Sequence, residues 1–345
     1  DYENMIKAYR MYKVFLNVNT VSDSGTMFSR RVLEILASGT SIVTTPSKAL
    51  EKWFGDTVFI TDSEEQTRNY LEVLLNNIDL LKRKSVLGVR KVHDKHLYSH
   101  RLQEIVDKIG LNEEVEDSNG ISIVTATKRP EFIENILRNY HNQTWEEKEL
   151  VIALNSDNFD LIELNNKIKD FKNVKVVECY GLSLGETLNK AIEVTRFNTV
   201  AKFDDDDYYG PEYVRDYMHA FNYTNASIIG KKSIFMYFKE NKLLSIKYPN
   251  SENRYQEFVY GATLVFKKYV WKNHRFPDVN QGEDSGFISS AMKDGYKLYS
   301  VNPFNYAYIR QNNKTHHTWG VDDYHLLRKS KIIGYMEDYI THVTV

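Results

Sequence analysis

The chain has 345 residues, enough for about two ordinary domains with substantial cores. Hydrophobic residues make up 42% of it and charged residues 27%, which is typical of a folded globular protein and excludes a disordered one. The formal net charge of −2 gives no reason to expect a nucleic-acid partner, and the only cysteine, Cys179, excludes a disulfide framework within the chain. Because no apolar run is long enough to cross a membrane and no signal segment opens the chain, we expect a cytoplasmic protein.

One acidic stretch divides the chain. Residues 112–120, NEEVEDSNG, hold a single hydrophobic residue and are the best candidate for a linker. We therefore expect an N-terminal domain at 1–111, a main domain at 121–320 and a C-terminal helical tail at 321–345.

The N-terminal domain alternates short strand-like and helix-like runs. Its predicted elements are strands at 13–18, 41–45 and 57–60 and helices at 28–39 and 47–55. The alternation predicts a parallel sheet flanked by helices, and three strands amount to a partial Rossmann-like α/β unit. Because the chain also begins at Asp1 rather than Met, we expect a fragment or a processed product.

The main domain alternates in the same way. Its predicted elements are strands at 121–124, 149–154, 174–179, 199–203 and 259–268 and helices that begin near Pro130, Ser183 and Glu283. This order predicts an α/β fold built on an open sheet flanked by helices. Gly261, in the last predicted strand, is expected to let a ligand approach closely.

Four consecutive carboxylates, Asp204, Asp205, Asp206 and Asp207, follow directly on the strand at 199–203. Two carboxylates about 4 Å apart repel each other by roughly 4 kcal/mol at an effective dielectric constant near 20. A folded chain tolerates this crowding if the acids spread into water or if a cation lies among them. Ligands of open α/β sheets bind at the carboxyl ends of strands, and Mg²⁺ and Mn²⁺ prefer carboxylate ligands. We therefore favour a metal and phosphate site over a solvated loop.

The segment FDDDDYYGP resembles the D-x-D-D motif of family 2 glycosyltransferases, and residues 121 to about 319 resemble that family as a whole. The resemblance implies a GT-A-type open mixed sheet and a nucleotide-sugar donor bound with Mn²⁺ or Mg²⁺. It places Asp204 and Asp205 at the donor, with Asp204 near the ribose or the metal. It places Asp206 and Asp207 at the metal.

An acidic pair, Glu283 and Asp284, opens a predicted amphipathic helix. Negative charge at a helix N-terminus suits the helix dipole, which is one explanation for the pair. In the family that the chain resembles, the Asp of this pair is the general base for the acceptor hydroxyl, so Asp284 takes that role and Glu283 lies beside it at the acceptor. A sugar hydroxyl is a weak nucleophile that needs such a base, which favours the catalytic interpretation.

Two further segments match the family's donor site. The loop TATKRP provides Thr125, Thr127 and Arg129 for the base and phosphates of the donor. The segment NNKTHHTWG provides His317 for the metal or the diphosphate, with His316 as the alternative. Its tryptophan either stacks on a sugar or simply packs.

One departure from the family concerns the donor base. The next strand of the family usually ends in an acidic pair, one member of which contacts the base, but Ala153 and Leu154 stand there. Asn155 or Asp157 is the expected substitute. A UDP-sugar remains the favoured donor.

The N-terminal segment at 24–46, SGTMFSRRVLEILASGTSIVTTP, resembles the nucleotide domain of GT-B glycosyltransferases of the spore-maturation type. Glu34 matches a ribose-binding Glu, but Thr26 replaces its acidic partner and the acceptor half is missing. We therefore favour a structural or docking remnant over a second active site. The basic run at 81–96 is either a solvated face, which we favour, or a contact for a membrane surface or an anionic polymer.

The acidic motifs and the resemblance together predict a metal-dependent inverting glycosyltransferase. It would move a sugar from a nucleotide diphosphate donor to a hydroxyl acceptor in bacterial surface polysaccharide or glycoconjugate synthesis. The alternative is a non-catalytic carbohydrate-binding or scaffold module derived from a glycosyltransferase, which would bind glycan without nucleotide or metal.

Overall fold

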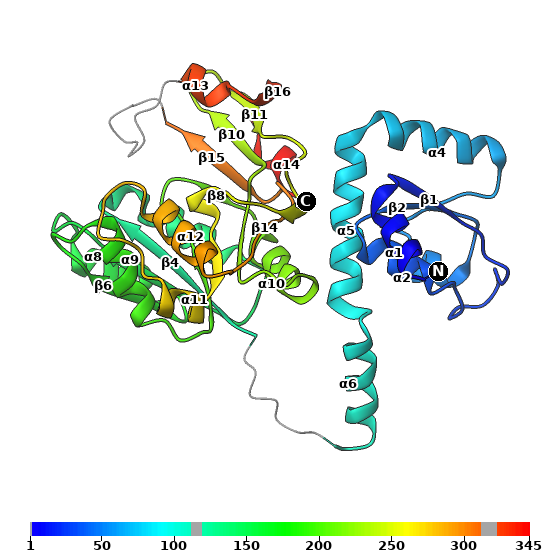
Figure 1. Cartoon of the computed structure of the whole chain (residues 1–345), viewed down its shortest axis with the longest axis horizontal. Coiled ribbons are helices and arrows are strands. Elements are labelled where there is room, and N and C mark those ends of the chain that lie inside the picture. The colour runs from blue at the N-terminus through cyan, green and yellow to red at the C-terminus, as the bar shows by residue number, and fades with distance from the viewer. Residues whose placement is uncertain (1, 112–118, 312–322) are drawn as a thin grey trace. The chain divides into compact units, whose positions relative to one another are not determined.

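The computed structural model describes residues 2–111, 119–311 and 323–345. The chain divides into two compact units, residues 1–114 and 115–345. Figure 1 labels the elements of both units. Within the described ranges, no helix combines the length and the apolar character that a membrane span requires.

The first unit is a three-stranded parallel sheet, in the order β1-β2-β3, with helices packed on it. Its elements are α1 (Tyr2–Met11), β1 (Val14–Asn17), α2 (Arg31–Ala37), β2 (Ser41–Thr44), α3 (Lys48–Phe54), β3 (Phe59–Ile60), α4 (Glu64–Asn76), α5 (Ile78–Lys95) and α6 (Tyr98–Lys108). The predicted strands and helices are all present, and Ser47 caps α3 by accepting a hydrogen bond from the Leu50 amide. Helix α1 was not predicted; it adds the buried Tyr9 to the core.

The second unit is built on an eight-stranded mixed sheet with the order β12-β14-β9-β13-β7-β4-β5-β6. Its strands are β4 (Ile121–Thr127), β5 (Lys148–Leu154), β6 (Val174–Glu178), β7 (Thr199–Lys202), β9 (Ile228–Gly230), β12 (Arg254–Tyr255), β13 (Val265–Lys267) and β14 (Leu298–Ser300). Strand β4 pairs in parallel with both β5 and β7, whereas β13 pairs antiparallel with β7 and β9. The predicted α/β fold class with an open mixed sheet is confirmed.

Helices cover both faces of this sheet. The helices of the second unit are η1 (Pro130–Phe132), α7 (Ile133–His141), α8 (Leu161–Ile168), α9 (Leu184–Glu193), α10 (Tyr213–Tyr223), η2 (Gly261–Thr263), α11 (Lys268–Asn273), α12 (Glu283–Lys293), α13 (Asp323–Leu327) and α14 (Ile340–Val343). Ile123 packs in one core with α7, α8 and α10, and its neighbour Val124 packs in the other with α9, α11 and α12. Successive side chains of a strand point to opposite faces, so the apolar run of β4 supplies both cores.

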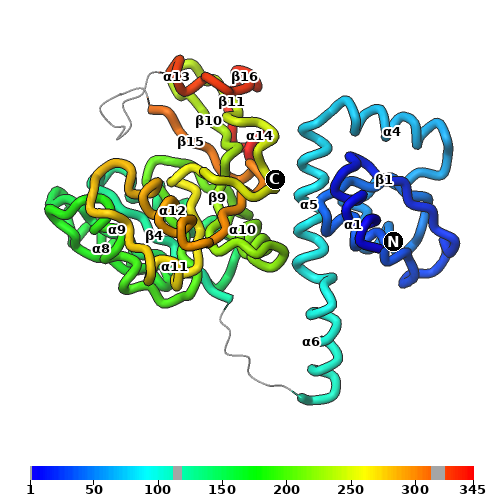
Figure 2. The backbone as a smooth tube through the Cα atoms, in the orientation of Figure 1, coloured from blue at the N-terminus to red at the C-terminus, as the bar shows by residue number. Residues whose placement is uncertain are grey.

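A smaller five-stranded sheet has the order β16-β11-β10-β15-β8. Its strands are β8 (Tyr208–Tyr209), β10 (Ile234–Phe238), β11 (Leu243–Lys247), β15 (Tyr306–Arg310) and β16 (Ser330–Tyr335). The expected helical tail at 321–345 is therefore wrong in part, because β16 pairs antiparallel with β11, as the red trace in Figure 2 shows. The β-branched and aromatic residues of SKIIGY suit a strand at a sheet edge.

The predicted strand at 259–268 is also only partly correct. Residues Gly261–Thr263 form the turn η2, and the strand is limited to Val265–Lys267. The turn brings Gly261 against the start of α12, where its lack of a side chain matters for the site described below.

Candidate functional site

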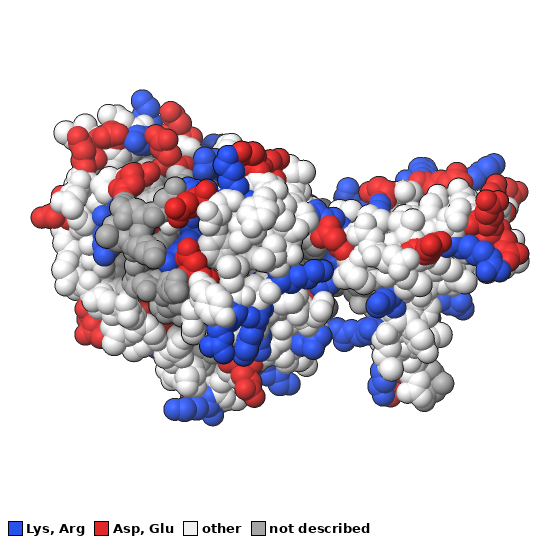
Figure 3. Space-filling view, turned by 90° about the horizontal axis from the view of Figure 1, so that it is seen from above, with Lys and Arg blue, Asp and Glu red and all other residues white. Residues whose placement is uncertain are grey.

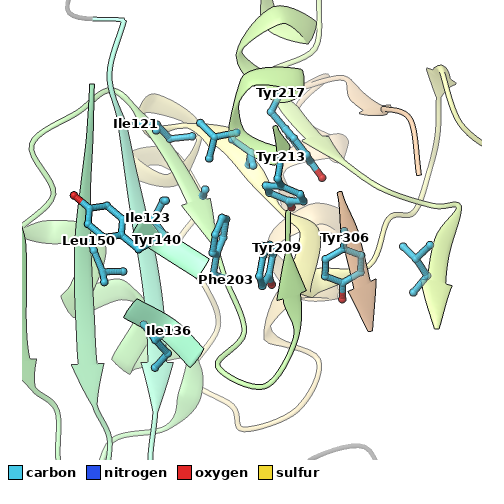
Figure 4. Close-up of a cluster of buried hydrophobic side chains, with 14 of the residues drawn as sticks. Ile121, Ile123, Ile136, Tyr140, Leu150, Phe203, Tyr209, Tyr213, Tyr217 and Tyr306 are labelled. Carbon is cyan, nitrogen blue, oxygen red and sulfur yellow. The ribbon is translucent and has the colours of Figure 1, made fainter. Parts of the chain in front are cut away.

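The four aspartates lie between β7 and β8, on a platform of aromatic side chains. The rings of Phe203 and Tyr209 stack with their centroids 3.8 Å apart, and Tyr306 lies 5.3 Å from Tyr209 (Figure 4). The Tyr209 hydroxyl donates a hydrogen bond to the Ala262 carbonyl (2.6 Å) and accepts one from the Asp204 amide (2.8 Å). This platform fixes where the acidic segment begins.

Two asparagines of α7 fix the backbone of the acidic segment from the other side. The Asn135 amide donates to the carbonyls of Asp205 (2.7 Å) and Asp207 (3.0 Å). The Asn139 amide donates to the Asp207 carbonyl (2.9 Å) and its oxygen accepts from the Tyr209 amide (3.3 Å). The sequence analysis missed both; their spacing of four residues on an amphipathic helix is the signal that could have identified them.

The four carboxylates alternate in exposure. Asp205 and Asp207 are buried, whereas the side chains of Asp204 and Asp206 are 38% and 14% exposed. These residues form the turn that joins β7 to β8, and the turn separates the run into a buried pair and a more exposed pair. Asp204 and Asp206 therefore form the pair that solvent and ligands can reach.

Arg129 and Thr127, two of the residues predicted for the donor, bind Asp205. The Arg129 guanidinium contacts both oxygens of Asp205 and also lies 3.0 Å from Asp206, while the Thr127 hydroxyl donates to Asp205 (2.6 Å). Burial lowers the pKa of Arg129, but Asp205 and Asp206 raise it by more, so the guanidinium stays charged. The end of β4 and the acidic segment are thus joined by a charged network.

Asp206 is strongly affected by this crowding. Burial and the neighbouring Asp205 and Asp204 raise its pKa to about 7, although Arg129 opposes the shift. A cation placed beside Asp206 would relieve the repulsion and favour the ionised form.

Asp207 is engaged elsewhere. Its two oxygens accept hydrogen bonds from the Tyr306 hydroxyl (2.5 Å) and the Ile309 amide (3.0 Å), both on β15. Burial, followed by Asp206 and Asp204, raises the pKa of this carboxyl well above its usual range. The predicted metal role of Asp207 finds no support in this arrangement.

Lys202, the last residue of β7, joins the two acidic motifs. Its side chain is 7% exposed, and its Nζ lies 2.7 Å from Asp204 Oδ1 and 3.2 Å from Asp284 Oδ2. Burial lowers its pKa, but Asp204, Asp284 and Glu283 raise it above the ordinary value. The sequence analysis missed Lys202, although a lysine at the end of an apolar strand and just before four acids is a visible signal.

Glu283 and Asp284 open α12, directly after Gly282, which has a positive φ of 84°. Burial and Asp284 raise the pKa of Glu283 to about 7. Burial and Asp204 raise the pKa of Asp284, while Lys202 lowers it. Among the described residues, Asp284 Oδ1 is a buried atom without a hydrogen-bond partner, whereas Oδ2 is held by Lys202.

Gly261 makes room for Asp284 rather than for a ligand, which corrects the expectation from the sequence. A Cβ atom at this position would lie 1.7 Å from Asp284 Oδ2 and 2.3 Å from its Cγ. Gly261→Ala should therefore displace the Asp284 side chain and lower any turnover that depends on Asp284 at least tenfold. Gly25→Ala is the matched control, because a Cβ there meets open space. Steady-state kinetics and circular dichroism check both variants, and full activity of folded Gly261→Ala would contradict the geometry.

The remaining predicted residues are placed as follows. Thr125 is buried in β4, next to the Thr127 network. Asn155 donates to the Leu182 carbonyl (3.1 Å), and Asp157 is exposed. His317 and its alternative His316 lie outside the described residues.

The carboxylates at the end of β7 fit a divalent ion. In the described part of the chain, no group of three His, Cys, Asp or Glu side chains is arranged to hold a metal. Mg²⁺ and Mn²⁺ need fewer than three protein ligands, because they bind one or two carboxylates and complete their coordination shell with substrate phosphates and water. Asp204 and Asp206, partly exposed and crowded by other acids, are such a pair.

The first unit offers no comparable site at its predicted residue. Glu34 is bound by its own chain, since it accepts from the Tyr2 hydroxyl (2.9 Å) and pairs with Arg30 (2.9 Å). In the basic run, Arg83 pairs with Asp79 on the same helix. On the face drawn in Figure 3, Lys and Arg side chains lie among Asp and Glu side chains.

Comparisons with solved structures give distant likenesses. S. aureus TarS 1–349 is 16% identical, with 55% of this chain and 60% of that chain covered and a TM-score of 0.46. The mannosyltransferase PcManGT from Pyrobaculum calidifontis, in complex with GDP-Man and Mn²⁺, is 12% identical, with 67% and 69% covered and a TM-score of 0.44. The chain thus spans less than two thirds of the TarS structure. No curated protein matches the sequence.

Two family models match the sequence. Residues 1–107 match a model described as glycosyl transferase-like, and residues 122–270 match glycosyl transferase family 2. The second match includes the acidic segment and Gly261, and it ends within α11, so α12 lies outside it. Residues 122–270 are thus similar to glycosyl transferase family 2, and the preceding residues 1–107 are similar to a glycosyl transferase-like family.

Proposed function

We propose that the second unit is a metal-dependent inverting glycosyltransferase that moves a sugar from a nucleotide diphosphate donor, a UDP-sugar by preference, to a hydroxyl acceptor. The observation that carries the proposal is the meeting of the two acidic motifs: Lys202 contacts both Asp204 and Asp284, although these acids are far apart in the sequence. Bacterial surface polysaccharide or glycoconjugate synthesis is the setting that the family resemblance suggests.

In this proposal each part of the site has a distinct task. Asp206, with Asp204, holds the divalent ion, and the ion supplies a Lewis acid and a template for the diphosphate. Asp284 accepts the proton of the acceptor hydroxyl through Oδ1, the oxygen that no described residue engages. Its raised pKa suits this task, because a general base works best with a pKa near the working pH.

Arg129 and Lys202 keep the carboxylates in place around the reacting groups. Arg129 holds Asp205 and Asp206, and Lys202 holds Asp204 and Asp284. In the proposed reaction the acceptor hydroxyl, deprotonated by Asp284, displaces the nucleoside diphosphate directly, with inversion at the anomeric carbon.

The test is donor turnover by the full chain. UDP-glucose, UDP-N-acetylglucosamine and GDP-mannose are each incubated with Mn²⁺ or with EDTA, and release of the nucleoside diphosphate is measured, with water taking the sugar in place of the acceptor hydroxyl. We expect release from one donor class, dependent on Mn²⁺ and lost in Asp206→Ala but not in Asp170→Ala, an exposed acid. No release from any donor, or equal release in EDTA, would contradict the proposal and favour a scaffold or carbohydrate-binding module.

A further inference from the structure

Lys202 is a buried cation at the centre of the candidate site, and nothing in the family assignment gives it a task. We propose that Lys202 is an internal counter-ion that competes with the divalent metal and positions Asp284 for proton transfer. The inference rests on the proposed function, because it presupposes that the acids at the end of β7 bind a metal.

The cations of the site divide the acids between them. Arg129 is engaged by Asp205 and Asp206, which leaves Asp204 and Asp284 to Lys202. Glu283, buried next to Asp284, adds to the negative potential around the same ammonium. Lys202 therefore supplies the positive charge that makes this second group of acids tolerable without a metal.

A divalent ion that binds Asp204 approaches this ammonium, and like charges repel strongly in a partly buried site. Lys202 should therefore weaken binding of the free ion. A nucleoside diphosphate brings additional negative charge and phosphate ligands, which offset the repulsion. The expected consequence is ordered binding, in which Mn²⁺ binds weakly alone and tightly together with the nucleotide.

Lys202 also fixes the direction of Asp284. Its Nζ binds Oδ2 at 3.2 Å, and Gly261 provides the space in which that oxygen lies. The other oxygen, Oδ1, is left without a described partner. Loss of the Lys202 ammonium should thus misplace Asp284 and slow the reaction. It should also leave the carboxylates free to bind a metal more tightly, so turnover and metal affinity should change in opposite directions.

The experiment compares Lys202→Met and Lys202→Arg with the wild-type full chain. Free Mn²⁺ is titrated by electron paramagnetic resonance without nucleotide, and donor turnover is measured separately. We expect Lys202→Met to bind Mn²⁺ at least tenfold more tightly and to turn over donor at least tenfold more slowly. Lys202→Arg, which keeps the charge, should stay within threefold of wild type in Mn²⁺ affinity.

Lys231→Met is the matched control for loss of a buried lysine. The Lys231 side chain is fully buried, and its Nζ donates to the Asn302 carbonyl (2.5 Å) and lies 5.2 Å from the Tyr213 ring centroid. The Mn²⁺ affinity of Lys231→Met should equal that of wild type. If Lys202 were merely structural, Lys202→Met would bind Mn²⁺ no better than wild type, and that result overturns the inference.

Two measurements keep the outcome decisive. If Lys202→Met does not fold, the double variant Lys202→Met/Asp284→Asn takes its place, because it removes a positive and a negative charge together. It is compared with Asp284→Asn alone. Equal Mn²⁺ affinity of these two variants overturns the inference. If wild type binds no Mn²⁺ even with UDP or GDP, the proposed function fails and this inference falls with it. A third outcome separates the two claims. If wild type binds Mn²⁺ in the presence of nucleotide but Lys202→Met binds free Mn²⁺ no more tightly than wild type, the proposed function stands and the counter-ion role of Lys202 is refuted.

Discussion

Asp284→Asn is expected to lower the rate of sugar transfer by about 10²–10⁴-fold, the usual contribution of a positioned general base. The amide has nearly the same shape as the carboxylate, and its oxygen can still accept the Lys202 hydrogen bond now made by Oδ2. It cannot take up the proton of the acceptor hydroxyl. Donor affinity should therefore stay within about threefold of wild type, as measured by titration of the nucleotide with Mn²⁺ present.

Asp294→Asn, at the C-terminal end of the same helix, is the control for Asp284→Asn. The Asp294 side chain is 67% exposed and lies 3.3 Å from His274, away from Lys202. Its turnover should equal that of wild type. Equal loss of donor binding and of transfer in Asp284→Asn would remove Asp284 from the role of base and assign it to the donor site.

Arg129→Met should destabilise the second unit by about 3–5 kcal/mol, the usual cost of leaving one partner of a buried ion pair without the other. The side chains of Arg129 and Asp205 are only 17% and 6% exposed, so water cannot replace the lost guanidinium. For a unit of this size the melting temperature should fall by about 6–20 °C. Differential scanning calorimetry of the full chain measures the shift.

Lys167→Met is the matched control for the loss of an ion pair. Lys167 and Glu163 form an exposed pair within α8, with their charged atoms 2.8 Å apart, and such pairs contribute about 0.3–0.5 kcal/mol. Its melting temperature should change by about 2 °C or less. A similarly small change in Arg129→Met would show that Arg129 is not needed to hold Asp205 and Asp206.

The sequence predicted the elements whose signals are local. The apolar run before Asp204, the cap at Ser183 and the proline at 130 each specify an element within a few residues, and the structure contains all three elements. The Ser183 hydroxyl accepts a hydrogen bond from the Glu186 amide, as the capping spacing predicts. The order of these elements was enough to predict an open α/β sheet with acids at the end of a central strand.

The features that the sequence did not reveal depend on contacts between distant segments. Nothing near Gly261 in the sequence shows that its missing Cβ is the space for Asp284. Nor does the sequence near Asp207 show that its carboxylate accepts a hydrogen bond from Tyr306 on β15. Four identical residues in a row look alike in the sequence, and only the packed structure shows which two of them are buried.

The most direct test of the central claim, that the acids form one metal and nucleotide site, is thermal unfolding with UDP, GDP or CMP. Each nucleotide is added with Mn²⁺ or with EDTA to the wild-type chain, Asp206→Ala and Asp170→Ala. A ligand at 100 times its Kd stabilises the unit that binds it by about 2.7 kcal/mol, which corresponds to several degrees. We predict such a shift with one nucleotide, dependent on both Mn²⁺ and Asp206. No shift with any nucleotide, or a shift that persists in EDTA and in Asp206→Ala, would contradict the claim.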